Sequence, residues 1–462
     1  LKYSQNTNKN TITKQMSEVI KLKRGLDIRL AGRSETVYAN VAPAEQYAIK
    51  PSDFKGLTPK MVAKVGDKVN AGDALFVDKM HPEVRFVSPV SGELIAVNRG
   101  ERRVILEVVV KADGNTTTCD FGKEDIQSLS RDQIITKLLN SGAWTYFKQR
   151  PYNIVADPQL DFKSIFVSTF DTAPLAPDYD FVINGNEANF QAGLDVLSKI
   201  APTFIGVQAE SANKAFNGAK GVTITKFSGK HPSGCVGIQI NNVQPINIGE
   251  RVLTIGVQEV VAIGKMFTTG ILDFGRIVVV CGSEIKKPAY IRTIVGAQLT
   301  NILKDNIASD NVRVISGDVL TGTQTATDGY LGYYDDQVSV IPEGNDYEFM
   351  GWAMPGFNKF SNHKTFLSWL TGNKSYKLDT NMHGERRAFV VSGELDEVLP
   401  MDIYPEFLFK AIMAQDIDKM IELGICEVVE EDIALCEFVC TSKIPLQKIL
   451  RNGLNLMAVE VG

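Results

Sequence analysis

The pattern that most restricts the fold of this chain is a pair of Gly-Asp steps in its first quarter. Gly66-Asp67-Lys68-Val69 and Gly72-Asp73-Ala74-Leu75 share the form G-D-x-V/L, and Ser88-Pro-Val-Ser-Gly92 follows them. Short apolar segments separated by Gly-Asp turns are typical of β-strands joined by tight corners. Glycine supplies the positive φ that such corners require, so the pattern predicts short strands joined by Gly-Asp turns.

This segment resembles the barrel-sandwich hybrid of biotinyl and lipoyl carriers. Lys79, within Asp78-Lys79-Met80, falls between the two halves, where a carrier presents its modified lysine. His81-Pro82 follows at once, and proline at that turn position fits poorly with an exposed carrier hairpin. An unmodified surface lysine is the simpler interpretation, because this fold is reused for work other than carrying a group. Carrier function remains an alternative.

Length and charge exclude several classes of protein. A chain of 462 residues is long enough for roughly three domains. A formal charge of −5 predicts no nucleic-acid surface. Six scattered cysteines do not form a disulfide framework, which indicates a reducing compartment. The chain has no apolar run that would cross a bilayer, so we expect a water-soluble protein or one held at a membrane by something else.

The first residues lie outside this pattern. Residues 1–15 are polar, contain no apolar signal-peptide region, and are expected to be a disordered extension or residues foreign to the natural protein. Met16 opens the first patterned segment.

Helical periodicity begins near residue 130, and the pattern then becomes mixed. Ser130-Arg-Asp-Gln133 is a capping-box sequence, and Gly142 ends the predicted helix. Further on, predicted strands alternate with a helix over Glu187–Lys199, which favours a parallel sheet covered by helices. Neither G-x-G-x-x-G nor G-x₄-G-K-S/T occurs in the chain, so the usual phosphate cradles of dinucleotide and triphosphate sites are missing. The region from residue 276 to 315 is predicted to be a small β-grasp-like unit, and the chain is helical again from Tyr404.

The C-terminal region carries half of a metal-cluster motif. Cys436 and Cys440 have the spacing that closes the ferredoxin-type sequence C-x₂-C-x₂-C-x₃-C-P, whose thiolates hold a [4Fe–4S] cluster. The other two ligand positions are Glu430 and Ile433. Isoleucine does not bind iron, and one carboxylate is a poor substitute for a thiolate. The alternative is that the two cysteines merely share one face of a buried helix.

The order of these regions resembles the electron-entry subunits of respiratory complexes. That superfamily includes the flavin- and NADH-binding subunit of complex I and the C subunit of the Rnf complex. Within it, the chain is most similar to the family of A subunits of the sodium-translocating NADH:quinone oxidoreductase (Na⁺-NQR). The residues that carry the resemblance include Lys23-Arg-Gly-Leu-Asp27, Ser88-Pro-Val-Ser-Gly92, Ser141-Gly-Ala-Trp144, Arg150-Pro151, Asp171-Thr172, Ala192-Gly-Leu-Asp195, His231-Pro232, Arg313-Val-Ile-Ser-Gly317, Gly351-Trp-Ala-Met-Pro-Gly356 and Leu435-Cys-Glu-Phe-Val-Cys440.

The resemblance implies an α/β multidomain fold in six parts. These are an extension (1–15), an N-terminal β domain with a barrel-sandwich hybrid (16–128), a Rossmann-like α/β domain (129–270), a β-grasp or SLBB-like unit (271–335), a mixed connecting segment (336–400) and a helical C-terminal domain with a vestigial iron–sulfur motif (401–462).

The family also implies a role on the cytoplasmic side of the bacterial inner membrane. There the chain would be peripheral, docked on a membrane-embedded component of the complex, and would contribute to quinone reduction and assembly. No redox cofactor is expected on this chain, while NADH, flavins and iron–sulfur centres are expected on partner subunits. Where the complex I relative has a glycine-rich flavin loop, this chain has Ser141-Gly-Ala-Trp-Thr-Tyr-Phe147, whose bulky side chains would block close backbone approach. Sodium is not expected to bind here, because ion passage needs polar groups within a bilayer.

A quinone site needs an apolar slot and hydrogen-bond donors for two carbonyl oxygens. One aromatic and basic loop offers both, and a second candidate lies nearer the N-terminus; the residues are Trp144, Tyr146, Phe147, Lys148, Arg150 and Tyr152, with Tyr47. The alternative is that these aromatics fill a former flavin pocket and touch no ligand. A free-standing flavin-dependent NADH dehydrogenase, a carrier modified at Lys79 and a pure scaffold also remain open. The sequence does not distinguish ubiquinone from menaquinone.

Overall fold

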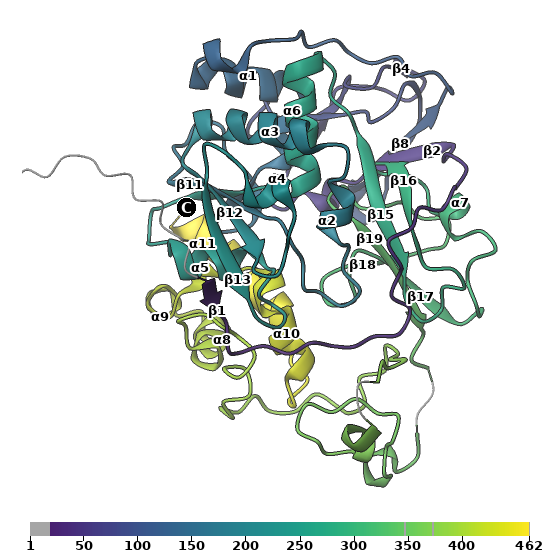
Figure 1. Cartoon of the computed structure of the whole chain (residues 1–462), viewed down its shortest axis with the longest axis vertical. Helices are drawn as coiled ribbons and strands as arrows, with labels where there is room; N and C mark the ends of the chain where they lie inside the picture. The colour runs from purple at the N-terminus through teal and green to yellow at the C-terminus, as the bar shows by residue number, and fades with distance from the viewer. Residues whose placement is uncertain (1–18, 346–347, 372–373, 462) are drawn as a thin grey trace, which may run out of the picture.

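The computed structural model describes residues 19–345, 348–371 and 374–461. The predictions for residues 1–15 and for Met16 lie outside the described residues. Figure 1 shows a layered body, with helices α1, α3 and α6 over the central sheet, a second sheet beside it and the C-terminal helices below. A loop-rich lobe extends from the lower end of the body.

The N-terminal region forms two small sheets, as the Gly-Asp pattern predicts. One has the order β2 (Gln46–Ile49), β8 (Ile105–Ala112), β7 (Gly92–Arg99), β4 (Lys68–Val69), and the other has β3 (Pro59–Met61), β5 (Ala74–Asp78), β6 (Arg85–Val87).

The two Gly-Asp corners of this region have the same construction. Gly66 and Gly72 have φ values of 95° and 103°. The Asp67 carboxylate accepts a hydrogen bond from the Lys64 backbone N–H at 2.8 Å, and Asp73 accepts one from Asn70 at 2.7 Å. Each pair therefore closes its turn with a positive-φ glycine and a carboxylate that satisfies the backbone.

The central sheet has seven strands, five of them parallel. Its order is β1 (Val19–Lys21), β13 (Thr223–Ser228), β12 (Thr203–Gln208), β11 (Ser164–Ser168), β14 (Val252–Thr254), β9 (Lys148–Arg150) and β10 (Ile154–Val155). The last two strands are antiparallel to their neighbours. Strand β1 comes from the chain's N-terminal side and pairs with β13, which no local pattern predicts.

Helices cover this sheet on its faces (Figure 1). They are α1 (Arg131–Ser141), α2 (Tyr179–Val182), α3 (Glu187–Ile200), α4 (Lys214–Asn217), α5 (Val236–Val243) and α6 (Val257–Thr269). The capping box at Ser130 and Gln133 is confirmed, and Gly142 ends α1 in the left-handed conformation at φ 79°. Helix α3 begins at Glu187, the residue that the sequence predicts.

A second, five-stranded sheet follows. Its order is β16 (Ala289–Ile294), β15 (Gly275–Cys281), β19 (Gln337–Pro342), β17 (Val312–Ser316) and β18 (Thr323–Thr325), with helix α7 (Thr300–Leu303) beside it. Strand β19 is central, pairing with both β15 and β17. The sheet therefore continues past residue 335.

The C-terminal region is helical. Helices α8 (Pro405–Ala414), α9 (Ile417–Glu422), α10 (Glu430–Val439) and α11 (Leu446–Glu460) share one apolar cluster that reaches Tyr152 and Ile238 of the central domain. Among the described residues, the helices are all too short or too polar to cross a membrane.

Candidate functional site

A cleft of about 210 Å³ opens at the carboxyl edge of the central sheet. Strands β11 and β14 end there, helices α5 and α6 begin there, and β9 runs antiparallel to β14 so that Lys148 lies opposite Thr254. In parallel α/β sheets this edge is the usual place for a ligand, because loops from several strands converge on it. The walls include Tyr146, Lys148, Phe170, Tyr179, His231, Ile255, Leu320, Tyr334, Glu259, Asp318, Asp336 and Glu431.

His231 is the cleft residue with the clearest unused hydrogen-bonding group. Its side chain is only 3% exposed, and its Nε2 atom has no hydrogen-bond partner among the described residues. Nδ1 lies 3.2 Å from the hydroxyl of Thr172, which already accepts a hydrogen bond from the Gly234 backbone N–H. That arrangement favours donation from Thr172 to Nδ1, leaving the ring hydrogen on Nε2.

The protonation state of His231 follows from its burial. Burial lowers the pKa of the imidazole, although the nearby carboxylates of Asp318 and Asp27 oppose the shift. The ring is therefore neutral at neutral pH, with one N–H to offer a carbonyl oxygen.

Two segments that carry the family resemblance meet at this histidine. The Asp27 carboxylate accepts a hydrogen bond from the His231 backbone N–H at 2.9 Å. Gly25 has φ 130°, and a Cβ there would lie 2.4 Å from the His231 carbonyl oxygen. Only glycine allows the N-terminal segment to approach so closely, and this contact fixes the turn that presents His231.

Lys148 is the second donor in the cleft. Its Nζ atom lies 3.8 Å from the centre of the Tyr334 ring, so a cation–π contact orients the ammonium group. Tyr334 is itself held by a hydrogen bond of 2.6 Å to the Thr145 carbonyl oxygen.

The first turn of α6 is already covered by a carboxylate. A Cβ placed on Gly256, just before this helix, would lie 2.2 Å from Oε2 of Glu259, so the Glu259 side chain folds back over the helix start. The other oxygen, Oε1, accepts a hydrogen bond from Arg276 at 2.6 Å. A helix start is a favoured phosphate site, and here a fixed negative charge takes that place.

The acidic groups at the cleft are coupled to Arg276. Burial raises the pKa of Asp336 to about 6, the Arg276 guanidinium opposes this, and the charge of Glu259 adds to it. Tyr179 donates a hydrogen bond of 2.8 Å to the Asp336 carboxylate. The cleft thus combines aromatic walls, two donors and a negative lining that disfavours phosphate groups.

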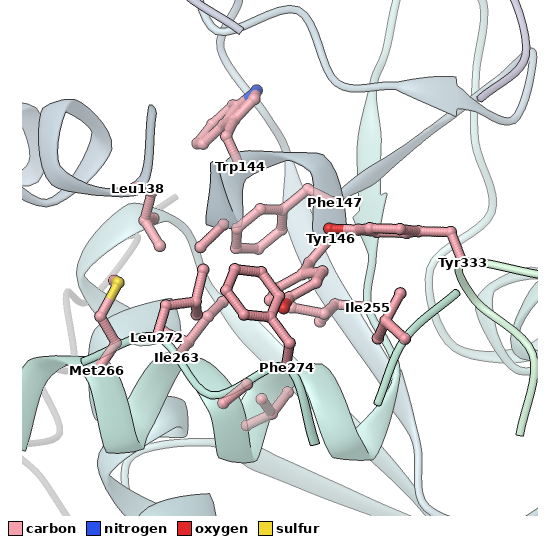
Figure 2. Packing of buried hydrophobic residues seen from close by; sticks show 14 of the residues in the cluster. Leu138, Trp144, Tyr146, Phe147, Ile255, Ile263, Met266, Leu272, Phe274 and Tyr333 are labelled. Atoms are coloured by element: carbon pink, nitrogen blue, oxygen red, sulfur yellow. The ribbon is translucent and has the colours of Figure 1, made fainter. Parts of the chain in front are cut away.

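The loop predicted to contact quinone divides between the cleft and the core. Tyr146 and Lys148 line the cleft. Trp144 and Phe147 are completely buried, and Figure 2 shows them packed in one cluster with Ile263 and Phe274. The indole N–H of Trp144 donates to the Ala156 carbonyl oxygen at 2.7 Å.

The remaining candidates lie elsewhere. Tyr47, in β2 of the N-terminal domain, is 3% exposed and forms a bridge to Ala297, which follows β16 of the second sheet. Tyr152 is 8% exposed and belongs to the apolar cluster of the C-terminal helices. Neither side chain lies among the residues lining the cleft.

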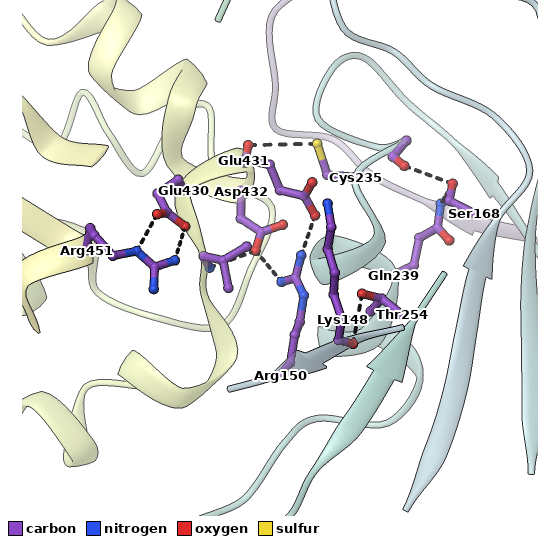
Figure 3. A network of polar contacts seen from close by, with 12 residues as sticks. Lys148, Arg150, Ser168, Cys235, Gln239, Thr254, Glu430, Glu431, Asp432 and Arg451 are labelled. Atoms are coloured by element: carbon purple, nitrogen blue, oxygen red, sulfur yellow. Dashed lines mark hydrogen bonds and ion pairs between the residues drawn. The ribbon is translucent and has the colours of Figure 1, made fainter. Parts of the chain in front are cut away.

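Arg150 connects the central sheet to helix α10 (Figure 3). Its guanidinium, 1% exposed, donates to Asp432 at 2.5 Å and also pairs with Glu431. Asp432, which is fully buried, also accepts a hydrogen bond from the Val429 backbone N–H at 3.0 Å. Arg150 therefore has its charge neutralised at the domain junction.

The four cluster-motif positions lie along α10 or directly at its end and have other contacts. Glu430 forms a two-point ion pair with Arg451, both distances being 2.6 Å, and a third contact of 2.6 Å with Lys55. Ile433, Cys436 and Cys440 are fully buried in the apolar cluster of the C-terminal helices. Burial raises the pKa of the Cys436 thiol, so it stays protonated. Among the described residues, no group of three or more His, Cys, Asp or Glu side chains could hold a metal ion.

The Glu430 pair predicts a specific acid sensitivity. Burial alone would raise the pKa of Glu430, but hydrogen bonding to Arg451 and the charge of Lys55 lower it to about 2. Because the pKa of Glu430 is lower in the folded state than in the unfolded state, its ionised carboxylate stabilises the fold above about pH 4.5. This stabilisation is lost as the pH falls towards 2. We expect Glu430→Gln to lower the free energy of unfolding by about 2–3 kcal/mol at pH 7.

Urea unfolding between pH 3 and pH 7 checks this expectation, with the exposed Glu422→Gln on α9 as control. The difference in the free energy of unfolding between wild type and Glu430→Gln should become smaller as the pH falls. The control substitution should change the free energy of unfolding by less than about 0.5 kcal/mol at every pH. If this difference in the free energy of unfolding did not change with pH, the lowered pKa of Glu430 would be contradicted.

His231 lines the cleft but was not among the site residues predicted from the sequence. A lone histidine in a turn is more often structural, and nothing local shows that this residue lines a cleft. The signal was present only in combination, because His231-Pro232 and Lys23-Arg-Gly-Leu-Asp27 both carry the family resemblance and meet in space.

Known protein domains match this chain in order along its length. They are the "NqrA N-terminal barrel-sandwich hybrid domain" over residues 20–113, the "NqrA second alpha/beta domain" over 129–272, and the SLBB-type "NQRA C-terminal domain" over 277–327. The fold is thus a mixed α/β multidomain fold with an N-terminal barrel-sandwich hybrid and an SLBB-like domain.

Full-length relatives extend the match. The A subunit of the Na(+)-translocating NADH-quinone reductase of Hahella chejuensis is 37% identical over 446 residues, covering 96% of this chain and 100% of that protein. The proteins of the same name from Haemophilus influenzae (strain PittGG) and Actinobacillus pleuropneumoniae serotype 5b are 38% and 39% identical, with the same coverage. The chain belongs to the family of A subunits of the Na⁺-translocating NADH-quinone reductases. An NAD⁺-reducing [NiFe]-hydrogenase in the air-oxidized state aligns over 75% of this chain and 67% of that chain, but its TM-score of 0.36 and 13% identity are too low to carry an inference.

Proposed function

We propose that this chain is the peripheral, cytoplasmic-side subunit of a sodium-pumping NADH:quinone oxidoreductase and that its cleft binds a quinone head group. It docks on a membrane-embedded partner, and the other subunits carry NADH, flavins and iron–sulfur centres. Electrons reach the quinone from those subunits, while this chain holds and orients the ring. The single observation that supports quinone binding most strongly is the unpartnered Nε2 of His231 at the cleft wall.

The chemistry of the cleft suits a quinone better than a nucleotide. A quinone ring is flat and uncharged, and its two carbonyl oxygens accept hydrogen bonds. Tyr146, Tyr179 and Tyr334 supply aromatic walls, and His231 and Lys148 supply donors. A flavin or nicotinamide nucleotide would bring phosphates close to Glu259, whose carboxylate already covers the start of α6.

Two former cofactor sites are proposed to have been filled by side chains. Ser141, Ala143, Trp144 and Phe147 are buried where relatives with a flavin have a glycine-rich loop. Along α10, an ion-paired Glu430 and a buried Ile433 replace two thiolate ligands. Both observations support a protein without a redox group of its own and a vestigial iron–sulfur motif.

A scaffold role without quinone binding is the second candidate. It is favoured because five of the seven residues expected to contact the ligand are buried and do not line the cleft, namely Trp144, Phe147, Arg150, Tyr152 and Tyr47. In that case the chain organises the complex only, and the cleft holds no quinone.

Lys148→Gln separates quinone binding from a scaffold role. The lysine is only half-buried, so the variant should fold normally and should bind a short-chain quinone roughly ten- to hundredfold more weakly, the worth of one charge-assisted hydrogen bond. Titration of the full chain, followed by tyrosine fluorescence, measures the affinity. Arg150→Ala is unsuitable for this purpose because it would leave the Asp432 carboxylate unpaired.

Lys199→Gln is the matched control, since Lys199 is also half-buried and makes one hydrogen bond, of 3.0 Å to the Gln127 carbonyl oxygen, away from the cleft. Its quinone affinity should equal that of the wild type. Absence of binding by all three proteins would leave the scaffold role, whereas equal affinities for all three would place the quinone away from Lys148 and contradict the proposed site.

We also propose the six-part domain division that the family resemblance implies.

Two other classes of protein function have simple tests. A free-standing flavin-dependent dehydrogenase predicts a yellow protein that oxidises NADH alone. A carrier predicts a mass increase on Lys79, which is exposed at the tip of the β5–β6 hairpin. Co-purification in detergent with integral-membrane flavoprotein subunits supports the proposed docking instead.

A further inference from the structure

Residues 349–370, here called the aromatic lobe, expose an unusual amount of apolar surface. Figure 1 shows the segment in green at the lower end of the molecule, away from the sheets. Phe349 is 90% exposed and Trp352 79%, while Trp369 and Leu370 are 51% and 59% exposed. Met350, Met354, Phe357 and Leu367 are also exposed. Exposed apolar groups gathered in one segment mark an interaction surface.

The lobe is attached to the body through its other side. The Phe360 ring lies 5.6 Å from the Tyr376 ring and 5.7 Å from the Phe438 ring of α10. Tyr376 in turn forms a bridge to Leu30, and its backbone N–H donates to the Arg29 carbonyl oxygen at 2.7 Å. Among the described residues, no ring contact joins Trp352 or Trp369 to the body.

The charge of this region is opposite to that of the whole chain. From Phe349 to Leu378 the sequence contains four lysines, no arginine and no Asp or Glu, although the chain carries a net charge of −5. Lys359 pairs with Glu348, and Lys377 pairs with Glu284 at 2.5 Å. Lys364 and Lys374 have no ion-pair partner among the described residues; Lys364 lies 5.6 Å from the Trp369 ring centre.

We propose that the aromatic lobe binds directly to the surface of an anionic phospholipid bilayer. Tryptophan side chains prefer the depth of lipid headgroups, and lysines beside them attract anionic lipids. A protein partner is less well matched, because protein interfaces are depleted in lysine and enriched in arginine, and this region has four lysines and no arginine. The inference goes beyond the proposed function, since it requires no ligand in the cleft.

Vesicle binding by the full chain tests the proposal. The chain should bind vesicles of phosphatidylcholine mixed with phosphatidylglycerol, should bind pure phosphatidylcholine much more weakly, and should dissociate as salt increases. Brominated lipids should quench its tryptophan fluorescence. The signal reports on the lobe, because Trp144, the third tryptophan of the chain, is fully buried.

Two pairs of substitutions resolve the apolar and charged contributions. Lys364→Gln with Lys374→Gln should weaken binding to anionic vesicles roughly thirtyfold. Trp352→Ser with Trp369→Ser should weaken it by more than roughly tenfold and abolish quenching. The matched controls are Val62→Ser with Val65→Ser, and Lys64→Gln with Lys68→Gln, all exposed on the N-terminal domain, and they should bind as the wild type does.

Three results would overturn the proposal. One is absence of binding to anionic vesicles, and another is equal loss of binding in the lobe variants and the controls. The third is that, in the assembled complex without lipid, partner subunits already shield Trp352 and Trp369 from aqueous quenchers, which would assign the lobe to a protein interface.

Discussion

Replacing Arg150 by methionine should lower the free energy of unfolding by about 3–5 kcal/mol. The substitution keeps most of the side-chain volume but leaves the fully buried Asp432 carboxylate without its partner. Burial already raises the pKa of Asp432 to about 6 despite the opposing charge of Arg150. Without that charge, Asp432 must either stay buried as an unpaired anion or take up a proton at the junction of the central sheet and α10, and both are unfavourable. Urea unfolding at pH 7 measures the loss, and hydrogen exchange should show α10 losing protection.

The reason for this loss can be checked with a second substitution. Asp432→Asn in the Arg150→Met background removes the stranded charge but keeps an oxygen for the Val429 backbone N–H, so it should restore more than half of the lost stability. Arg131→Met is the control, since Arg131 pairs at 3.1 Å with an Asp161 side chain that is 97% exposed, and it should cost less than about 1 kcal/mol. If Arg131→Met and Arg150→Met lowered the free energy of unfolding equally, the importance of the buried Arg150–Asp432 pair would be contradicted.

Replacing Trp144 by alanine should also cost about 3–5 kcal/mol, because it opens a large cavity in the main core. The indole is fully buried, and its loss also leaves the Ala156 carbonyl oxygen without a donor. Thermal and urea unfolding measure the effect.

The chain provides a matched control of the same residue type. Trp352→Ala changes a side chain that is 79% exposed and should alter stability by less than about 0.5 kcal/mol. Trp144→Phe should lower the free energy of unfolding by an intermediate amount, since it keeps much of the aromatic ring but removes the hydrogen bond to Ala156. If Trp144→Ala proved as mild as Trp352→Ala, the segment would not be the filled core that the fold indicates.

Local patterns predicted those parts of the fold that local physics determines. The Gly-Asp corners, the capping box at Ser130 and the end of α1 at Gly142 depend on a few adjacent residues and are present as expected. The pairing of β1 with β13 and the central position of β19 are long-range, so no periodicity reveals them.

The candidate site could be predicted only in part for the same reason. The aromatic and basic loop was expected to act as one unit, but Lys148 lies at the cleft and Arg150, two residues along β9, pairs with the carboxylates of α10. Sequence alone does not show which end or face of a short strand meets which domain. Glu430 is a comparable case, since the sequence shows its spacing to Cys436 and Cys440 but does not show its partners Arg451 and Lys55.

Cofactor analysis tests most directly the central claim that side chains have replaced the iron–sulfur and flavin sites of this protein. The full chain would be prepared without oxygen, incubated with iron, sulfide and flavin, and desalted. The amounts of iron, sulfide and flavin that remain bound would then be measured per protein chain. We expect only trace amounts of all three, because Ile433 and Glu430 cannot complete a cluster and Trp144 is proposed to fill a former flavin site. Stoichiometric iron and sulfide, or one tightly held flavin per chain, would contradict the account.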